Sequence, residues 1–271
     1  MNNTSVTLLC DTDFSCAFQQ SYLRRFYSLR LRSTNHRSST RKIRSASAME
    51  QKVRQMQNFF GLRETGILDS NTMDVMKKPR CGVPDVDNYS FYPYHPKWKN
   101  RTISYKIAKY TPDLSREDVE RSFRLALKMW SDAAPLNFVK VIHGKADIVL
   151  SFAHRAHGDF SPFDGPGGVL AHAFQPGEGM GGDVHFDEDE TWTTGGALSI
   201  SFSLFAVAAH ELGHSLGLTH SRDPSAVMFP SYRHQSSKQY TLSTDDVLGI
   251  QRLYGEEHIL FSMKYFLNKK N

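Results

Sequence analysis

The stretch HELGHSLGLTH, from His210 to His220, is the part of the sequence that decides which fold and chemistry to expect. If it begins as a helix, His210 and His214 project from one face with Cβ atoms roughly 5–6 Å apart, a separation that suits two ligands of one zinc ion. A third ligand has to come from beyond the helix. Gly217 lacks a Cβ and can adopt a positive φ, so it permits the turn that brings His220 to the same ion.

The three histidines predict a catalytic rather than a structural zinc site. Three nitrogen ligands leave the fourth tetrahedral position to water, which is the open arrangement of catalytic zinc. Glu211 is not needed as a ligand, so it can take a proton from the zinc-bound water and later pass it to a leaving amine, while the metal polarises a carbonyl. The alternative is an amphipathic helix with surface histidines, but the combination favours peptide hydrolysis.

A methionine after the third histidine completes a known signature. HExxHxxGxxH followed by a methionine is the pattern of the metzincins, which this chain resembles, and Met228 lies eight residues beyond His220. The resemblance implies that this methionine sits in a tight turn beneath the metal. In another context the same residue would be core filler.

A second motif, PRCGVPD from Pro79 to Asp85, resembles the cysteine switch of the matrix metalloproteinases. A thiolate is a strong zinc ligand, so Cys81 can occupy the fourth position, displace the water and hold the enzyme latent. An isolated cysteine could instead be a small buried hydrophobe, but the glycine, two prolines and charged pair around it favour a shaped loop. The resemblance implies that Arg80 and Asp85 pair and fix that loop.

Hydrophobic periodicity agrees with the fold that the resemblance implies. The segments 101–110, 137–141 and 146–153 read as strands, and 115–133 carries one apolar helical stripe behind a possible N-cap, Ser115. Asp245 and Asp246 open a last helix. We therefore expect an α/β (α+β) metzincin catalytic domain with a twisted mixed sheet, two long helices and a C-terminal helix.

Composition bounds the class of protein. The chain has 271 residues and 39% hydrophobic residues, which fits a soluble globular protein with a sound core. The three cysteines, Cys10, Cys16 and Cys81, leave the rest of the chain to be held by packing and metals rather than by disulfides. No segment approaches the roughly 20 apolar residues that span a bilayer.

The net charge is divided unevenly along the chain. The first 54 residues carry ten Lys or Arg and three acids, a charge of +7, so the remainder sums to −2 of the total of +5. The Arg- and Ser-rich N-terminal segment could be a transit peptide, a nucleic-acid tail or, as we favour, disordered sequence. No secretory signal is visible in it.

The resemblance divides the chain into four parts. Residues 1–48 are an atypical basic segment that we expect to be disordered, and 49–88 resemble a partial helical propeptide that carries the switch. Residues 89–255 would be the zinc metalloprotease domain, followed by a short tail, 256–271. This layout is the minimal, matrilysin-like form without a hemopexin-like propeller, or a truncated isoform of a longer member.

The segment 154–190 is dense in His, Asp and Gly and predicts a second zinc site. Three imidazoles and one carboxylate would close a tetrahedral, structural site. Each of the four also matches a family position for a structural zinc; they are His157, Asp159, His172 and His185. His154 lies outside that pattern and reads as an ordinary surface residue.

Oxygen ligands in and around the same segment predict one to three calcium ions. A first site would combine carboxylates with backbone carbonyls of a glycine-rich loop: Asp164, Gly165, Gly167, Val169, Asp187 and Glu190. By resemblance, a second would use Asp147, Gly179, Gly181 and Asp183, and a third Asp113, Glu188 and Glu190. The alternative is a solvated acidic loop.

Substrate selection is predicted to depend on an edge strand and a pocket. An extended peptide could pair with the strand near GGVLAHAF and so place its scissile carbonyl at the zinc. In the family, the residue four before the first zinc histidine lines the pocket beside the metal. Here it is Ala206, whose small side chain should leave the pocket deep and tolerant of long apolar groups.

The leading hypothesis is a latent, secreted-type zinc endopeptidase that cuts extracellular matrix proteins, including collagen, or cell-surface proteins. The resemblance implies secretion to the matrix, inhibition by proteins of the tissue metalloproteinase-inhibitor type, and a monomer. A non-catalytic or permanently latent metal-binding isoform is the alternative, against which the intact Glu211 argues. A nucleic-acid function would need a recognised domain around the basic tail, and none is visible. Asn88 and Asn100 begin N-x-S/T sequons, which are glycosylated only in the secretory pathway.

Overall fold

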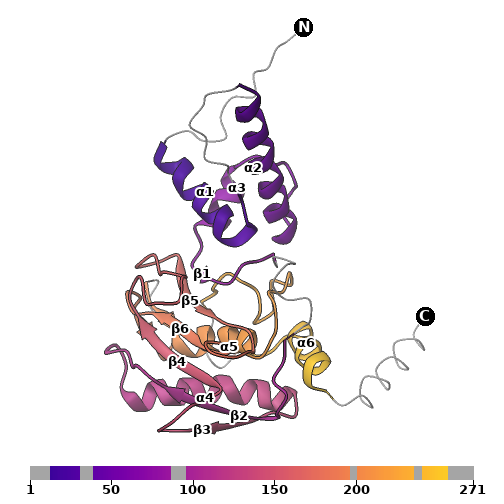
Figure 1. Cartoon of the computed structure of the whole chain (residues 1–271). Coiled ribbons are helices and arrows are strands. Elements are labelled where there is room, and N and C mark those ends of the chain that lie inside the picture. The colour runs from indigo at the N-terminus through magenta and orange to yellow at the C-terminus, as the bar shows by residue number, and fades with distance from the viewer. Residues whose placement is uncertain (1–12, 31–38, 87–95, 196–199, 235–239, 256–271) are drawn as a thin grey trace, which may run out of the picture. The chain divides into compact units, whose positions relative to one another are not determined.

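The computed structural model describes residues 13–30, 39–86, 96–195, 200–234 and 240–255, with side chains from residue 17 and, in the second range, from residue 47 (Figure 1). The chain divides into two compact units, Met1–Lys78 with Val83–Phe91, and Pro79–Gly82 with Tyr92–Asn271. The segment that carries Cys81 therefore belongs to the second unit. Cys10, Asn88 and the tail 256–271 lie outside the described residues.

The part of the first unit that the structure describes forms the helices α1 (Asp13–Tyr27), α2 (Ser39–Phe59) and α3 (Ser70–Met76). Gln57 of α2 is fully buried, and its amide nitrogen donates to Thr65 Oγ1, the Ile67 carbonyl and Thr72 Oγ1, each at 2.9 Å. This one side chain ties α2 to the loop before α3 and to α3 itself. Gly66 turns that loop with φ +73.

The expectation that residues 1–48 are disordered is wrong for Asp13–Tyr27, which form α1. Tyr22, Leu23, Phe26 and Tyr27 are buried, and the Tyr22 and Phe26 rings lie 4.7 Å apart. These residues recur at i, i+1, i+4 and i+5, which is one helical face. Arginines and serines dominate the composition of the segment and concealed that face. The helical part of the chain therefore begins well before residue 49, and α2 also starts before that residue, at Ser39.

In its described residues, the second unit contains a six-stranded mixed sheet, a two-stranded sheet and three helices. The large sheet has the order β1-β5-β6-β4-β2-β3, in which β5 runs antiparallel to β6 and the other pairs are parallel. The strands are β1 (Arg80–Cys81), β2 (Thr102–Ile107), β3 (Asn137–Lys140), β4 (Ile148–Ala153), β5 (Val169–Ala173), β6 (Val184–Asp187), β7 (Trp192–Thr193) and β8 (Phe202–Ser203). The helices are α4 (Arg116–Ala133), α5 (Leu204–Ser215) and α6 (Thr244–Tyr254). The expected fold class is confirmed.

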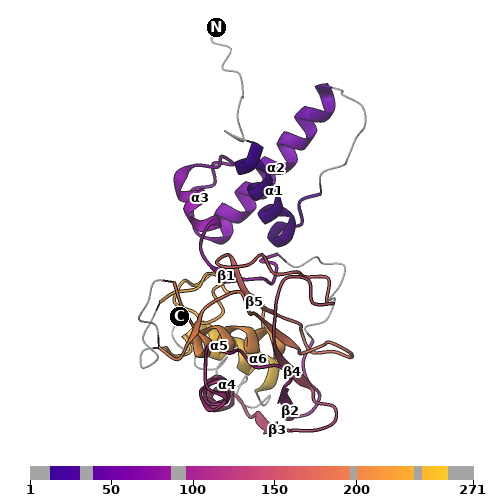
Figure 2. The ribbon, with the colours of Figure 1, turned by 90° about the vertical axis from the view of Figure 1, so that its left-hand side faces the viewer.

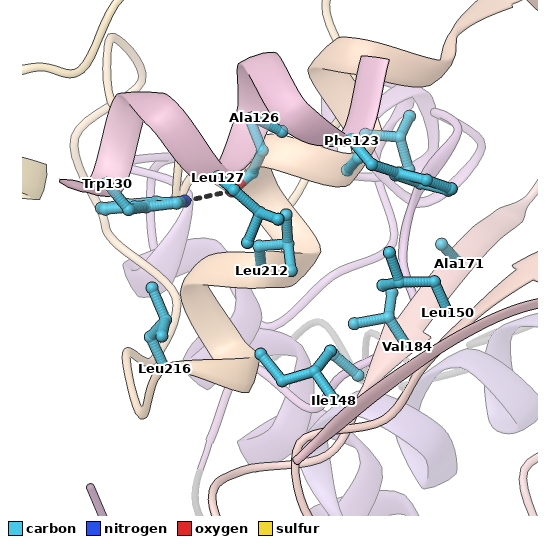
Figure 3. Packing of buried hydrophobic residues seen from close by; sticks show 14 of the residues in the cluster. Phe123, Ala126, Leu127, Trp130, Ile148, Leu150, Ala171, Val184, Leu212 and Leu216 are labelled. Carbon is cyan, nitrogen blue, oxygen red and sulfur yellow. Dashed lines mark hydrogen bonds between the residues drawn. The ribbon is translucent and has the colours of Figure 1, made fainter. Parts of the chain in front are cut away.

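The core of this unit forms where the sheet and α4 bury their apolar faces. On β4, Ile148, Leu150 and Phe152 alternate toward the interior, and the predicted stripe of α4 is buried throughout. Figure 3 shows Phe123 and Leu127 of α4 facing this layer. Ser115 caps α4, as expected, by accepting from the Asp118 N–H at 3.1 Å.

Helix α5 lies inside the unit, between α4 and β5 (Figures 1 and 2). Every residue of α5 is buried, which explains why its polar residues are few and confined to special positions. Among the described residues, no helix combines the length and the apolar character required to cross a bilayer.

Candidate metal centre

Helix α5 is fixed at both ends and in its middle. The Ser203 hydroxyl caps its start by accepting from the Ala206 N–H at 3.3 Å, and the Trp130 indole donates to the Ala209 carbonyl at 2.9 Å. After α5 ends, Gly217 adopts φ +102, and a Cβ there would lie 2.2 Å from the Pro96 carbonyl oxygen. The turn that the sequence predicted at Gly217 is therefore accessible only to glycine.

The turn brings four potential ligands together. One ligand atom from each of Cys81, His210, His214 and His220 lies within 4.8 Å of the others. Nδ1 of His210 lies 2.7 Å from the Val227 carbonyl, and Nδ1 of His214 lies 2.8 Å from the Leu218 carbonyl. Because a carbonyl can only accept a hydrogen bond, Nδ1 carries the proton in these two rings, and Nε2 keeps its lone pair for a metal.

The Met228 side chain packs against α5 at Gly213. A Cβ on Gly213 would lie 2.2 Å from the Met228 sulfur and 2.9 Å from the Trp130 ring. Gly213 lies between the two histidines of α5, and its lack of a side chain lets Met228 and Trp130 pack directly against the helix backbone. The sequence alone gives no signal of this role.

Asp246 of α6 holds the methionine turn in place. Its carboxylate is buried and accepts from the Val227 N–H at 2.8 Å and the Met228 N–H at 3.0 Å. Because the Val227 carbonyl orients His210, Asp246 acts on a metal ligand through one intermediate residue. The sequence marked this aspartate only as a helix start; it completes the α6 capping box, and nothing local distinguishes its second role.

Glu211 is almost fully buried beside the ligand cluster. Burial raises the pKa of its carboxyl to about 8, although a hydrogen bond with Cys81 and the charge of Arg80 act in the opposite direction. The cysteine, the glutamate and the histidines that the sequence predicted to act together thus lie together.

The segment around Cys81 lies along the edge of β5 that we expected a substrate to use. On one side, the Arg80 and Gly82 N–H groups donate to the Gly168 and Ala171 carbonyls, each at 2.7 Å. On the other side, the Cys81 N–H donates to the Pro230 carbonyl at 2.9 Å and the Tyr232 N–H donates to the Pro79 carbonyl at 2.8 Å. The segment therefore fills a two-sided slot that could accept any extended peptide.

A second cluster combines the four residues predicted to bind structural zinc. His157 Nε2, His172 Nε2 and His185 Nδ1 lie 2.6–2.7 Å from Asp159 Oδ2. Burial lowers the pKa of His172 and His185, which favours the neutral imidazole that a metal binds. Burial alone would raise the pKa of Asp159, but hydrogen bonds led by that of His172 outweigh it and lower the pKa. His154, as expected, is exposed, and it contacts Asp189 at 2.8 Å.

The carboxylates predicted for the first calcium site influence one another electrostatically. Asp187 and Glu190 are buried, and burial raises the pKa of both, that of Glu190 to about 7. The charges of Asp164 and Asp187 act in the same direction on Glu190. Two buried carboxylates that are repelled by each other and by the exposed Asp164 are a favourable place for a divalent cation.

The residues predicted for the other two calcium sites have partners within the protein. Asp147 Oδ2 accepts from the Ser104 N–H and hydroxyl at 2.7 and 2.6 Å, and Asp183 Oδ1 accepts from the Val149 N–H at 3.1 Å. The backbone is tight at Gly181, where a Cβ would lie 2.4 Å from Gly177, and Gly179 has φ +71. In the third set, Asp113 Oδ2 accepts from the Trp192 N–H and Glu188 Oε1 from the Thr111 hydroxyl.

A small pocket of about 30 Å³ opens beside the ligand cluster. Ala206 lines it, as predicted, together with apolar residues of β5, α5 and the segment after Met228. Arg233 and Tyr240 also line it. Neither residue could be predicted from the sequence, because only the folded chain brings them to Ala206.

This fold and these clusters define a zinc metallopeptidase domain that follows a helical domain. A profile of the Peptidase_M10 family, described as Matrixin, matches residues 97–255, and one described as a putative peptidoglycan binding domain matches residues 18–76. The chain therefore belongs to the matrixin family of zinc metalloendopeptidases. Zinc and calcium are its cofactors, as expected.

Three curated human relatives agree with this family. Human matrilysin is 52% identical over 237 residues, which cover 88% of this chain and 84% of that protein. Human matrix metalloproteinase-20 is 50% identical over 240 residues, 89% of this chain and 48% of that protein, and human neutrophil collagenase is 50% identical over 236 residues, 87% and 49%. The chain thus spans about half the length of the latter two.

Proposed function

We propose that this chain is a latent zinc endopeptidase that hydrolyses peptide bonds of extracellular matrix or cell-surface proteins. The observation that carries the proposal is the convergence of Cys81 with His210, His214 and His220 within 4.8 Å, beside the buried Glu211. The three histidines would hold the catalytic zinc. Cys81 would be its fourth ligand in the latent enzyme.

The chain's own residues account for the chemistry. Zinc, when bound, supplies a Lewis acid that polarises the scissile carbonyl and acidifies water. The Glu211 carboxylate accepts a proton from the attacking water and then donates it to the leaving amine. The Val227 and Leu218 carbonyls keep the His210 and His214 rings oriented throughout, so the ligand geometry does not relax between steps.

The remaining predicted ligands belong to the same proposal. His157, Asp159, His172 and His185 would bind a structural zinc, which is supported by their four-way contact through one carboxylate oxygen. Calcium would bind first at the Asp164, Asp187 and Glu190 loop, where the carboxylates repel one another. The second set (Asp147, Gly179, Gly181, Asp183) and the third (Asp113, Glu188, Glu190) remain proposed sites.

The domain layout and the setting are proposed in the same way. Residues 89–255 would form the protease and 256–271 a short tail. We also propose a secreted monomer that protein inhibitors of the tissue metalloproteinase-inhibitor type restrain. Asn100 begins a sequon and is exposed, so mass spectrometry of chain secreted from mammalian cells should find an N-glycan there. Chain confined to the cytosol, with Asn100 unmodified, would argue against this setting.

The central test uses the full chain and an organomercurial, which binds the Cys81 sulfur and so removes it from the zinc. Treated protein should hydrolyse a quenched peptide, and a zinc chelator should abolish the activity. Glu211→Gln should lower kcat by at least about a hundredfold while zinc stays bound. Undiminished turnover by that variant would refute the role of Glu211.

Permanent latency is the second candidate, and one observation favours it. The segment around Cys81 is held by four main-chain hydrogen bonds in addition to its sulfur. If mercurial and limited proteolysis both leave a folded, zinc-loaded protein without peptidase activity, this candidate replaces the first.

A further inference from the structure

A second pocket lies between α4 and the strands β2 and β3, which Figure 1 shows beside that helix. Its volume is about 180 Å³, many times the roughly 10–15 Å³ that one water requires. Its lining shares no residue with the pocket beside the ligand cluster. It is therefore a separate candidate site.

The contacts of Glu120 fix how α4 lies over this end of the sheet. Tyr105 of β2 is the Cα partner of Lys140 of β3, and Lys140 Nζ lies 2.7 Å from Glu120 Oε2. The other Glu120 oxygen accepts from the Tyr110 hydroxyl at 2.8 Å. Arg124 follows Glu120 by one turn on the same face of α4. It is thus held above β2, where it lines the pocket together with Tyr105.

Tyr105 supplies an unused donor to this pocket. The residue is only 7% exposed, and within the part of the chain that the structure describes its hydroxyl has no hydrogen-bond partner. Burial raises the pKa of the phenol, although the positive charge of Arg124 acts against that rise. The phenol therefore stays protonated at neutral pH and keeps its O–H for an acceptor that enters the pocket.

The rest of the lining has a cationic side and an apolar side. Lys128 is already paired with the exposed Asp132, at 2.6 Å, whereas Arg124 forms no ion pair with any described residue. None of the described lining residues is acidic. The apolar side consists of Leu127, Leu136 and Phe138. An unpaired guanidinium and an unpaired phenol thus face the same space, next to an apolar wall.

We propose that this pocket binds a small organic carboxylate that carries an apolar ring or chain. One carboxylate oxygen accepts from the Tyr105 hydroxyl and the other from the Arg124 guanidinium, while the apolar body packs on the leucines and Phe138. The pocket is smaller than the roughly 300–1,000 Å³ typical of sites for drug-sized ligands, so the occupant is a free small molecule. Binding requires neither zinc nor peptidase activity, so the latent full chain serves for the test.

Benzoate is the probe, titrated onto the full chain at low salt and neutral pH and followed by saturation-transfer NMR. Arg124→Met keeps an aliphatic stem but removes the charge, so it should weaken benzoate binding about tenfold or more. Tyr105→Phe removes only the hydroxyl and should weaken binding by a smaller factor. Arg252→Met removes the same charge from an exposed position of α6 and should bind benzoate as the wild type does.

Two further ligands test the two halves of the site separately. Benzyl alcohol has the ring without the charge, and acetate has the charge without the ring; each should bind several-fold more weakly than benzoate. The inference is overturned if the wild type shows no saturable benzoate binding, if acetate binds as tightly as benzoate, or if Arg124→Met and Tyr105→Phe both bind like the wild type. Urea midpoints equal to that of the wild type confirm that the variants are folded, as expected for an exposed arginine and for the loss of one oxygen.

Discussion

At the scale of single residues, Gly213 determines how closely α5 packs against Met228 and Trp130. Because a Cβ there would meet the Met228 sulfur at 2.2 Å, Gly213→Ala should destabilise the protein by about 1–3 kcal/mol through overpacking. It should also weaken zinc retention, since Gly213 lies between two ligands. Urea unfolding and zinc content after dialysis measure the two effects. Gly195→Ala is the matched control, because a Cβ at Gly195 meets nothing within 4 Å; equal effects of the two variants would contradict the argument.

Asp246 shows how a residue without a ligand role can control a ligand. Asp246→Asn keeps the size and shape of the side chain but replaces one carboxylate oxygen with an NH2 group, which donates. The N–H of either Val227 or Met228 then loses its acceptor. We expect a stability loss of about 1–3 kcal/mol and faster zinc loss to a competing chelator. Asp132→Asn changes an exposed carboxylate on α4 and should be neutral in both assays. Zinc loss at the wild-type rate would mean that Asp246 serves α6 alone.

At the scale of elements, packing of α4 against α5 holds in place the helix that contains His210 and His214. Trp130 is fully buried and donates across this contact to the Ala209 carbonyl. Trp130→Phe should cost about 1–3 kcal/mol, because the carbonyl is left unpaired in the core. Trp98→Phe removes a similar bond, to the Ser215 carbonyl, but Trp98 is only partly buried and water can replace the lost donor. Equal shifts of the urea midpoint in the two variants would refute this distinction.

The elements also explain which features could be predicted from sequence. His210 and His214 are four residues apart on one helix, so local geometry alone brings them together, and the alternation of β4 is equally local. Asp246, Arg233 and Tyr240 reach the site only through tertiary packing, and the sequence offers no signal of that approach. α1 was missed for another reason, since its four buried apolar residues lie in a segment whose composition arginines and serines dominate.

At the scale of the whole molecule, ions replace covalent cross-links in the second unit. No cysteine follows Cys81, so no disulfide can constrain the loops between β4 and α5. The proposed structural zinc instead joins the 157–159 loop to β5 and β6, while the proposed first calcium joins the glycine-rich loop to the end of β6. The folded conformation of loops that bury carboxylates is stable only while bound cations neutralise the carboxylate charges.

Removing calcium should therefore lower stability without removing the catalytic zinc. An ion at a hundred times its dissociation constant contributes about 2.7 kcal/mol, so a calcium-selective chelator should lower Tm by several degrees, and added calcium should restore it. Asp187→Asn, which removes one buried carboxylate from the first site, should unfold at a lower temperature in calcium and respond less to the chelator. Asp132→Asn should respond as the wild type does, because its carboxylate is exposed and outside the proposed sites. If the Tm of both the wild type and Asp187→Asn is independent of calcium, the loops stay folded without a bound cation. That result would refute the proposed calcium sites.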